Sequence, residues 1–203
     1  MYDLEIYSPT TLDDALQMKK KHGEELQILA GGTDVLVHIQ NNMDLWKRKK
    51  LLNISKIETL SLINETHKTI EIGPLVTHSQ LIQSQLIAQY APTLSKAASF
   101  IGSPQIRNQG TIGGNIVNAS PAADTLPVLY ARDAWIEVRT LNGEKVIPIA
   151  DFITGPGSVD LDPAGIVTKI IVPKMPDYFG DYLSLRQRKS MSVSYTHLRA
   201  HET

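Results

Sequence analysis

The sequence of 203 residues contains no cysteine. This absence excludes disulfide bonds, thiolate-bound zinc, cysteine-held iron–sulfur clusters and a cysteine nucleophile within the chain. Long apolar runs are missing too, since no segment approaches the roughly 18 residues that a membrane-spanning helix needs. The first residues also lack the basic stretch and apolar block of a secretory signal. We therefore expect a cytoplasmic protein without a membrane span.

An excess of either charge is also missing, because 20 Lys and Arg residues stand against 21 Asp and Glu residues. This balance gives no reason to expect binding to nucleic acid or to an anionic membrane. No acid–base or nucleophilic constellation and no metal-ligand pair stands out. The histidines are scattered, and we expect each to be exposed or hydrogen-bonded: His22, His38, His67, His78, His197 and His201.

What the sequence does contain begins with a small α/β unit in residues 1–57. A helix is predicted from Thr11 to His22, because Thr11 is a suitable N-cap, Asp14 follows three residues later and Gly23 can end the helix. Short apolar segments follow, the first and last of which are predicted strands: Leu26 to Ala30, Val35 to Ile39, and Leu51 to Ile54.

The remainder, residues 58–176, has the texture of a larger α+β unit. Asn142-Gly143 is a strong hairpin signal, and Pro92 suits a first helical turn. Gly102 to Ala123 is rich in Gly, Asn, Ser and Pro and is predicted to be irregular. The predicted strands are Thr59 to Asn64, Thr69 to Gly73, Trp135 to Thr140, Lys145 to Ile149 and Ile166 to Val172, and the predicted helices are Ser79 to Leu86, Pro92 to Ile101 and Asp124 to Ala131.

Two loops carry adjacent glycines. Gly31-Gly32 follows the first buried strand, and Gly113-Gly114 ends the segment Ser103 to Asn115. Glycine lets backbone amides approach a ligand closely, and successive exposed N–H groups bind anions. Neutral hydrogen-bond donors flank the glycines: Thr33, Thr111, Asn115 and Asn118. We predict that the amides of both loops converge on one diphosphate, although a tight turn is the simpler alternative for either loop alone.

The familiar nucleotide motifs are missing. No GxxxxGK-S/T segment is present, and Gly155-Pro156-Gly157 is not completed by the later glycine of a dinucleotide fingerprint. A nucleotide bound by this chain would therefore be held in neither of those two ways.

The glycine loops resemble the signatures of a known family. Ala30 to Asp34 (AGGTD) and Ser103 to Leu129 (SPQIRNQGTIGGNIVNASPAADTLPVL) are similar to the two motifs of the flavin-binding medium subunit of the molybdenum hydroxylases. That family includes xanthine dehydrogenase and carbon monoxide dehydrogenase. The resemblance extends over about residues 1–190, which is nearly the whole chain.

This resemblance implies a two-lobed α+β fold, the FAD-binding fold of the vanillyl-alcohol oxidase or PCMH type. The small N-terminal α/β lobe would comprise residues 1–57 and the larger α+β lobe residues 58–176, with FAD between them. Residues 177–203 would be the remnant of a linker to a missing C-terminal domain, followed by a tail that is not native to the protein.

The resemblance also implies which residues contact FAD. Asp124 would lie near the flavin's sugar chain, but it also fits a helix N-cap. Ile101 would lie beside the isoalloxazine ring, although we favour an ordinary core position for it. Arg107 could neutralise phosphate or hold its own loop, and we favour the second role. The implied FAD contacts are Leu29, Ala30, Gly31, Gly32, Thr33, Asp34, Val35, Leu36, Ile101, Thr111, Ile112, Gly113, Gly114, Asn115, Asp124 and Val167.

The function implied by the resemblance is that of an oxidoreductase subunit that transfers electrons. A large subunit would hold the molybdenum cofactor and a small subunit two 2Fe-2S clusters, from which FAD would pass electrons to NAD⁺ or another acceptor. Because the chain has no cysteine and no well-placed histidine, we expect noncovalent FAD, no metal and no catalytic side chain. A free-standing vanillyl-alcohol-oxidase-type flavin oxidase and a non-enzymatic nucleotide-binding module stay open as alternatives.

Overall fold

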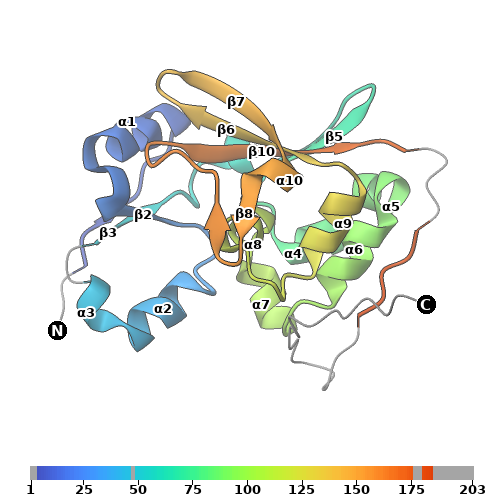
Figure 1. Cartoon of the computed structure of the whole chain (residues 1–203), viewed down its shortest axis with the longest axis horizontal. Helices are drawn as coiled ribbons and strands as arrows, with labels where there is room; N and C mark the ends of the chain where they lie inside the picture. The colour runs from blue at the N-terminus through green and yellow to red at the C-terminus, as the bar shows by residue number, and fades with distance from the viewer. Residues whose placement is uncertain (1–3, 47–48, 176–179, 185–203) are drawn as a thin grey trace, which may run out of the picture.

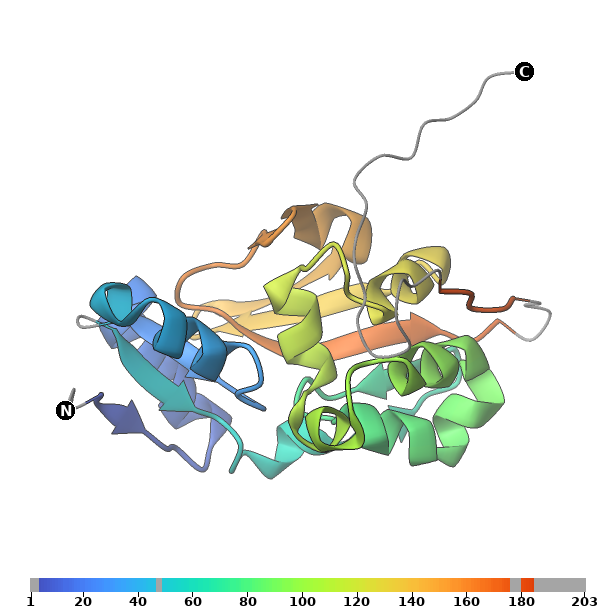
Figure 2. The same ribbon diagram turned by 90° about the horizontal axis from the view of Figure 1, so that it is seen from below.

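The computed structural model of the chain describes residues 4–46, 49–175 and 180–184. The strands of these residues form a three-stranded sheet, a five-stranded sheet and a two-stranded ribbon. The three-stranded sheet and its helices lie at one end of the molecule, and the five-stranded sheet and its helices lie at the other (Figures 1 and 2). The molecule is therefore built of two parts side by side, each with its own sheet and helices.

The three-stranded sheet is parallel. Its strands lie in the order β1 (Ile6–Tyr7), β3 (Lys50–Asn53) and β2 (Leu26–Leu29), with Ile28 opposite Leu52. Parallel neighbours need crossover connections, which are usually helical. The carboxyl ends of all three strands therefore meet at one edge of the sheet, and in open parallel sheets this edge is where ligands bind.

Helical segments make the crossovers of this sheet. Thr11 caps the first helix by accepting the Asp14 N–H at 3.2 Å, and Gly23 ends it with a φ of 53°, both as predicted. The second apolar run forms a helix, so the first glycine loop joins a strand to a helix. The helical segments are α1 (Leu12–His22), η1 (Gly23–Glu25), α2 (Val35–Asn41) and α3 (Met43–Trp46).

The core beneath the three-stranded sheet draws on both parts of the chain. Leu16 of α1 packs with Leu26 and Leu52 of the sheet, and the same cluster contains Leu75 and Ile166 from the second part. All of these side chains are less than a tenth exposed. Burial of apolar surface therefore holds the two parts together. Each Å² of apolar surface buried between them contributes about 25 cal/mol.

The five-stranded sheet is antiparallel, with its last strand at the centre. β10 (Ile166–Pro173) is β-branched over most of its length and pairs with β5 (Thr69–Ile72) on one side and β6 (Trp135–Thr140) on the other. Asn142-Gly143 closes the hairpin of β6 and β7 (Gly143–Pro148), as predicted, with Thr140 opposite Gly143. The strand order is β4 (Ile63–Glu65), β5 (Thr69–Ile72), β10 (Ile166–Pro173), β6 (Trp135–Thr140) and β7 (Gly143–Pro148).

Helices cover one face of this sheet (Figure 1). Ile72, Ile136 and Ile170 point from the sheet into a core that also contains Leu94 and Ile112 from the helices. The ribbon of β8 (Ile153–Gly155) and β9 (Ser158–Val159) follows the last of these helices. The helices are η2 (Glu58–Ser61), α4 (His78–Gln83), α5 (Gln85–Tyr90), α6 (Pro92–Ser99), α7 (Pro104–Gln109), α8 (Ile112–Asn118), α9 (Thr125–Ala131) and α10 (Ile149–Phe152).

Three local predictions are wrong. The first hairpin strand begins at Ile63, because residues 58–61 form the turn η2. The helix predicted from Ser79 to Leu86 is two helices, since Ser84 caps α5 by accepting the Ile87 N–H at 3.3 Å. The segment from Gly102 to Ala123, predicted to be irregular, contains α7 and α8, whose N-caps are Ser103 and Thr111. Its many glycines and asparagines hid these two helices in the sequence.

Two further expectations concern membranes and the C-terminal end. None of the helices in the described part of the chain is long and apolar enough to cross a membrane. Of the proposed linker remnant and tail, residues 177–203, only residues 180–184 are among those that the structure describes. Tyr182 of this short stretch donates a hydrogen bond to Asp124 at 2.6 Å, and Asp181 pairs with Lys96.

Candidate functional site

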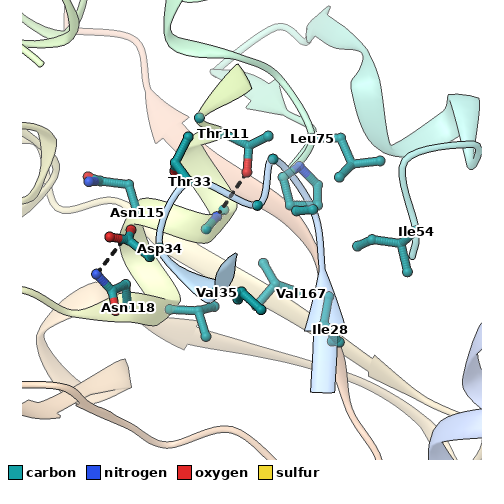
Figure 3. Close-up of a pocket in the computed structure, with 18 of the residues that line it drawn as sticks. Ile28, Thr33, Asp34, Val35, Ile54, Leu75, Thr111, Asn115, Asn118 and Val167 are labelled. Atoms are coloured by element: carbon teal, nitrogen blue, oxygen red, sulfur yellow. Dashed lines mark hydrogen bonds between the residues drawn. The ribbon is translucent and has the colours of Figure 1, made fainter. Parts of the chain in front are cut away.

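A cavity of about 620 Å³ opens between the two parts of the molecule (Figure 3). Its first wall consists of the residues that follow β2 and β3, such as Ala30 and Ile54. The opposite wall comes from α7 and α8, the loop before α4, and the start of β10, where Val167 lies. The cavity thus lies outside the carboxyl edge of the parallel sheet, and its volume falls within the range of roughly 300 to 1,000 Å³ that ligand pockets occupy.

The first glycine loop lines this cavity, and its backbone donors are not used within the described part of the chain. Gly32 has a φ of 75°, in the left-handed region, and the Leu36 N–H closes the turn onto the Gly32 carbonyl at 3.2 Å. The N–H groups of residues 31–35 have no acceptor within the described part of the chain. Asp34, at the N-cap of α2, makes no capping bond. A row of unpaired N–H groups before a helix is an anion-binding arrangement.

The second glycine loop is different, and here the prediction that both loops offer amides is wrong. The N–H groups of Ile112 and Gly113 donate to the carbonyls of Val76 and Pro74, both at 2.9 Å. The Gly114 N–H donates to Thr111 Oγ1 at 3.1 Å. These three donors are used within the protein, so the N–H groups of Ile112, Gly113 and Gly114 are not free for a ligand.

The two loops touch each other at the cavity. A methyl group at Gly31 would lie 1.9 Å from the carbonyl oxygen of Gln109, so only glycine allows this approach. Asn118 Nδ2 donates to Asp34 Oδ2 at 3.3 Å across the gap between the two parts (Figure 3). Gly32 and Gly114 both line the cavity. The loops therefore converge on one space, although they are more than seventy residues apart in sequence.

Most of the residues that the resemblance implied lie around this cavity. Leu29 and Leu36 do not line it, and they flank Gly32 instead. Ile112 is buried in the core. Asp124 does not line it either: it stands at the N-cap position of α9 without a capping bond and accepts the Tyr182 hydroxyl. The implied residues that do line the cavity are Ala30, Gly31, Gly32, Thr33, Asp34, Val35, Ile101, Thr111, Gly113, Gly114, Asn115 and Val167.

Arg107 holds its own loop, as favoured from the sequence. Its Nη1 donates to the carbonyl oxygens of Ile101 at 2.9 Å and Gly102 at 3.1 Å. Hydrogen bonds from a charged donor stabilise a fold by about 1.5 to 3 kcal/mol. The guanidinium thereby fixes the turn between α6 and α7, and with it the place of Ile101 in the cavity wall.

Several lining residues carried no signal in the sequence. Lys19 is buried, and its Nζ donates to the carbonyls of Leu26 at 2.8 Å and Gly23 at 3.2 Å. Burial and the nearby Lys49 lower the pKa of Lys19. His38, His78 and Asp162 also line the cavity. These residues come together only through the tertiary fold. No motif or spacing in the sequence could have pointed to them.

His78 contradicts the expectation that every histidine is exposed or hydrogen-bonded. Its side chain is 2% exposed, and its Nδ1 has no hydrogen-bond partner among the described residues. Burial lowers the pKa of His78 to about 4, an effect that Arg107 strengthens and Asp124 opposes. The imidazole is therefore neutral at pH 7. No group of three or more His, Asp or Glu side chains within the described ranges could hold a metal ion.

Comparison with solved structures identifies the fold. A chain of carbon monoxide dehydrogenase from Hydrogenophaga pseudoflava superposes with a TM-score of 0.88 and 27% identity, over 93% of this chain and 66% of that chain. Quinoline 2-oxidoreductase from Pseudomonas putida 86 gives a TM-score of 0.81 at 20% identity and supports the fold alone. The predicted α+β FAD-binding fold of this class of oxidoreductase is confirmed.

Sequence comparison then identifies the family. The profile of the FAD-binding domain in molybdopterin dehydrogenases matches residues 2–175. The nicotinate dehydrogenase FAD-subunit of Eubacterium barkeri is 32% identical over 96% of this chain and 67% of its own length. The xanthine dehydrogenase FAD-binding subunit of Escherichia coli O157:H7 is 32% identical over 99% of this chain and 69% of its own length. The chain therefore belongs to the FAD-binding domain family of the molybdopterin dehydrogenases.

Coverage of the relatives is partial. The 6-hydroxypseudooxynicotine dehydrogenase complex subunit alpha of Paenarthrobacter nicotinovorans is 33% identical over 82% of this chain but only 55% of its own length. This chain thus spans between about half and about two thirds of the relatives that it matches. The predicted family of FAD-binding oxidoreductase subunits is confirmed, whereas the activity, substrate and partners of a whole complex are a separate question.

Proposed function

We propose that this chain binds FAD noncovalently in the cavity and acts as the electron-transfer subunit of a molybdenum hydroxylase complex. The observation that carries the proposal is the row of N–H groups at residues 31–35, which have no acceptor among the described residues and belong to residues that line a cavity shared by the two parts. A diphosphate is the part of FAD that such a row recognises. Residues 1–57 and 58–176 would then be the two lobes of one FAD site.

The remaining lining residues fit the rest of the cofactor. Ile101, Ile106 and Leu75 form an apolar part of the wall that suits the isoalloxazine ring. Thr111 and Asn115 offer neutral polar side chains from the second lobe. Lys19 is the cation that lines the cavity within the described residues and partly offsets the charge of a diphosphate. The implied residues that line the cavity are therefore our proposed FAD contacts.

The proposed roles of FAD and of the chain explain why no catalytic side chain is needed. When bound, FAD supplies the redox chemistry, because it accepts and releases electrons singly or in pairs. The chain's own residues bind the diphosphate, orient the ring and exclude water from the apolar wall. Since this sequence contains no cysteine to hold 2Fe-2S clusters, we propose that a partner supplies them.

The names of the relatives support a role within a complex. They include a carbon monoxide dehydrogenase medium chain and a dehydrogenase complex subunit alpha. We propose that a small subunit with 2Fe-2S clusters delivers electrons, that a large subunit holds the molybdenum cofactor, and that NAD⁺ is the acceptor. We further propose that the protein works in the cytoplasm, in keeping with the lack of cysteine.

Flavin titration and reduction test this proposal. The flavin-free chain should bind one FAD per molecule, and acid precipitation should release the flavin because no covalent bond holds it. NADH should bleach the flavin absorbance of the loaded chain. Binding of FAD without bleaching would indicate another acceptor or a nucleotide-binding module, and direct oxidation of a small substrate with oxygen would indicate a free-standing flavin oxidase. No binding of FAD would contradict the proposal.

A further inference from the structure

His78 is fixed in the cavity wall by its backbone. It is the first residue of α4, which Thr77 begins with a capping box shared with Gln80. The His78 N–H donates to the Gly110 carbonyl at 3.0 Å. Next to it, Thr77 and Thr111 form an isolated antiparallel β-bridge. The second glycine loop therefore holds the start of α4 from one side, and the imidazole has a defined position in the wall.

The imidazole is enclosed but not fully hydrogen-bonded. Its side chain is 2% exposed, and Nδ1 has no partner among the residues that the structure describes. A Cβ at Gly110 would lie 3.2 Å from His78 Cδ2, so the glycine leaves the ring its room. Buried polar atoms without a partner are few in folded proteins, and each calls for an explanation.

The charged groups that face His78 are engaged elsewhere. Arg107 of α7 donates to the carbonyls of Ile101 and Gly102, and Asp124 at the start of α9 accepts the Tyr182 hydroxyl. Burial therefore dominates, and the ring stays neutral at pH 7. A neutral imidazole carries one N–H donor and one acceptor nitrogen. Such a group can pair with a ligand edge that alternates acceptors and donors, and it adds no charge to the site.

We propose that His78 is a cofactor-binding residue that hydrogen-bonds the polar edge of the isoalloxazine ring and so fixes its orientation against Ile101 and Ile106. This inference rests on the proposed function. The polar edge of that ring presents carbonyl oxygens on either side of an N–H group, so one nitrogen of a neutral imidazole can pair with it, either as the donor to a carbonyl oxygen or as the acceptor from the N–H. Ile101 and Ile106 line the same cavity as His78, so these apolar side chains would contact the face of the ring while the imidazole supplies a polar contact.

Three variants and two ligands test the inference. His78→Leu removes the hydrogen bond, His78→Gln keeps a donor and an acceptor, and His67→Leu is the matched control, since His67 is exposed in the turn between β4 and β5. Affinity is measured for FAD, by quenching of flavin fluorescence, and for ADP, which lacks the isoalloxazine ring, by calorimetry. Urea unfolding of each flavin-free variant reports stability.

The inference predicts that His78→Leu weakens FAD binding about tenfold or more and changes ADP binding less than twofold. His78→Gln should stay within about threefold of wild type for both ligands, and His78→Leu should unfold at the same urea concentration as wild type or higher. Equal weakening of FAD and ADP, or unchanged FAD binding in His78→Leu, would overturn the inference. Failure of wild type to bind FAD at all would instead overturn the proposed function.

Discussion

Gly31 lies directly against the backbone of Gln109, so close that a methyl group on its Cα would stand 1.9 Å from the Gln109 carbonyl oxygen. The two residues belong to different parts of the chain: Gly31 is in the first glycine loop, and Gln109 is in the segment that carries the second. The φ angle of Gly31 is not in the left-handed region, whereas that of Gly32 is, so backbone conformation does not explain why residue 31 is glycine. The reason for glycine at position 31 is therefore the close approach of the two loops beside the cavity.

Gly31→Ala should destabilise the protein, because the clash involves backbone atoms that cannot rotate away. Overpacking of this kind costs about 3 kcal/mol. Urea unfolding measures the loss, and FAD binding should weaken in parallel as the loops separate. Gly155→Ala is the matched control, since a Cβ there meets nothing within 4 Å, and it should change stability by less than about 0.5 kcal/mol. Equal effects of the two changes would contradict the close approach.

The neighbouring glycines 113 and 114 should respond differently to substitution. A Cβ at Gly113 would lie 2.4 Å from Pro74 Cβ, whereas one at Gly114 meets only Thr111 Oγ1, at 3.1 Å, beside the cavity. Gly113→Ala should therefore lower the unfolding free energy by about 2 kcal/mol or more. Gly114→Val should keep the fold, by circular dichroism, and lose FAD. Flavin content equal to wild type in Gly114→Val would contradict our assignment of this loop.

Asp34→Ala should have a weaker effect than Gly114→Val. Asp34 is exposed and accepts one hydrogen bond from Asn118 across the two lobes, so its carboxylate orients the loop. Loss of this bond should weaken FAD binding by a few-fold, which corresponds to about 0.5 to 1 kcal/mol. Asn118→Ala should give a similar value, and the double variant should add little. Strictly additive effects in a fluorescence titration would show that the two residues act separately.

Stability of the flavin-free protein should fall as the pH falls from about 6.5 to about 4. Burial places the folded-state pKa of His78 near 4, below the ordinary value of 6.5, so the unfolded chain takes up a proton first. The stabilisation is complete above pH 6.5 and is lost toward pH 4, on the order of 3 kcal/mol in total. Urea unfolding of wild type and His78→Leu at several pH values isolates this contribution, and identical slopes would disprove it.

Local rules in the sequence account for much of the fold. Thr11 and Gly23 bound the first helix, Asn142-Gly143 closes a hairpin, and the β-branched run from Ile166 forms the central strand. Helices α7 and α8 escaped prediction because glycine and asparagine disfavour helices, and packing overrides that preference here. Ser84 divides the helix predicted from Ser79 to Leu86, because its side chain caps a new helix by accepting the Ile87 N–H. The periodicity of apolar residues does not reveal such a break.

The candidate site was less predictable than the fold. The glycine motifs indicated which loops meet, but the carbonyls of Pro74 and Val76 take the amides of the second loop. Those contacts link segments far apart in sequence, so no local pattern announces them. His78 and Lys19 enter the cavity wall for the same reason. The sequence therefore indicated that the two loops meet, but its prediction that both supply backbone donors was wrong for the second loop.

The central claim is that the amides of residues 31–35 hold the diphosphate of one FAD. Amide NMR of the ¹⁵N-labelled chain during titration with FAD tests it most directly. Our account predicts saturation at one FAD per chain, with the amide signals of residues 31–35 moving most and gaining protection from exchange, while those of Gly113 and Gly114 are protected before any FAD is added. Saturation that leaves the signals of residues 31–35 unmoved, or no saturable binding, would contradict it.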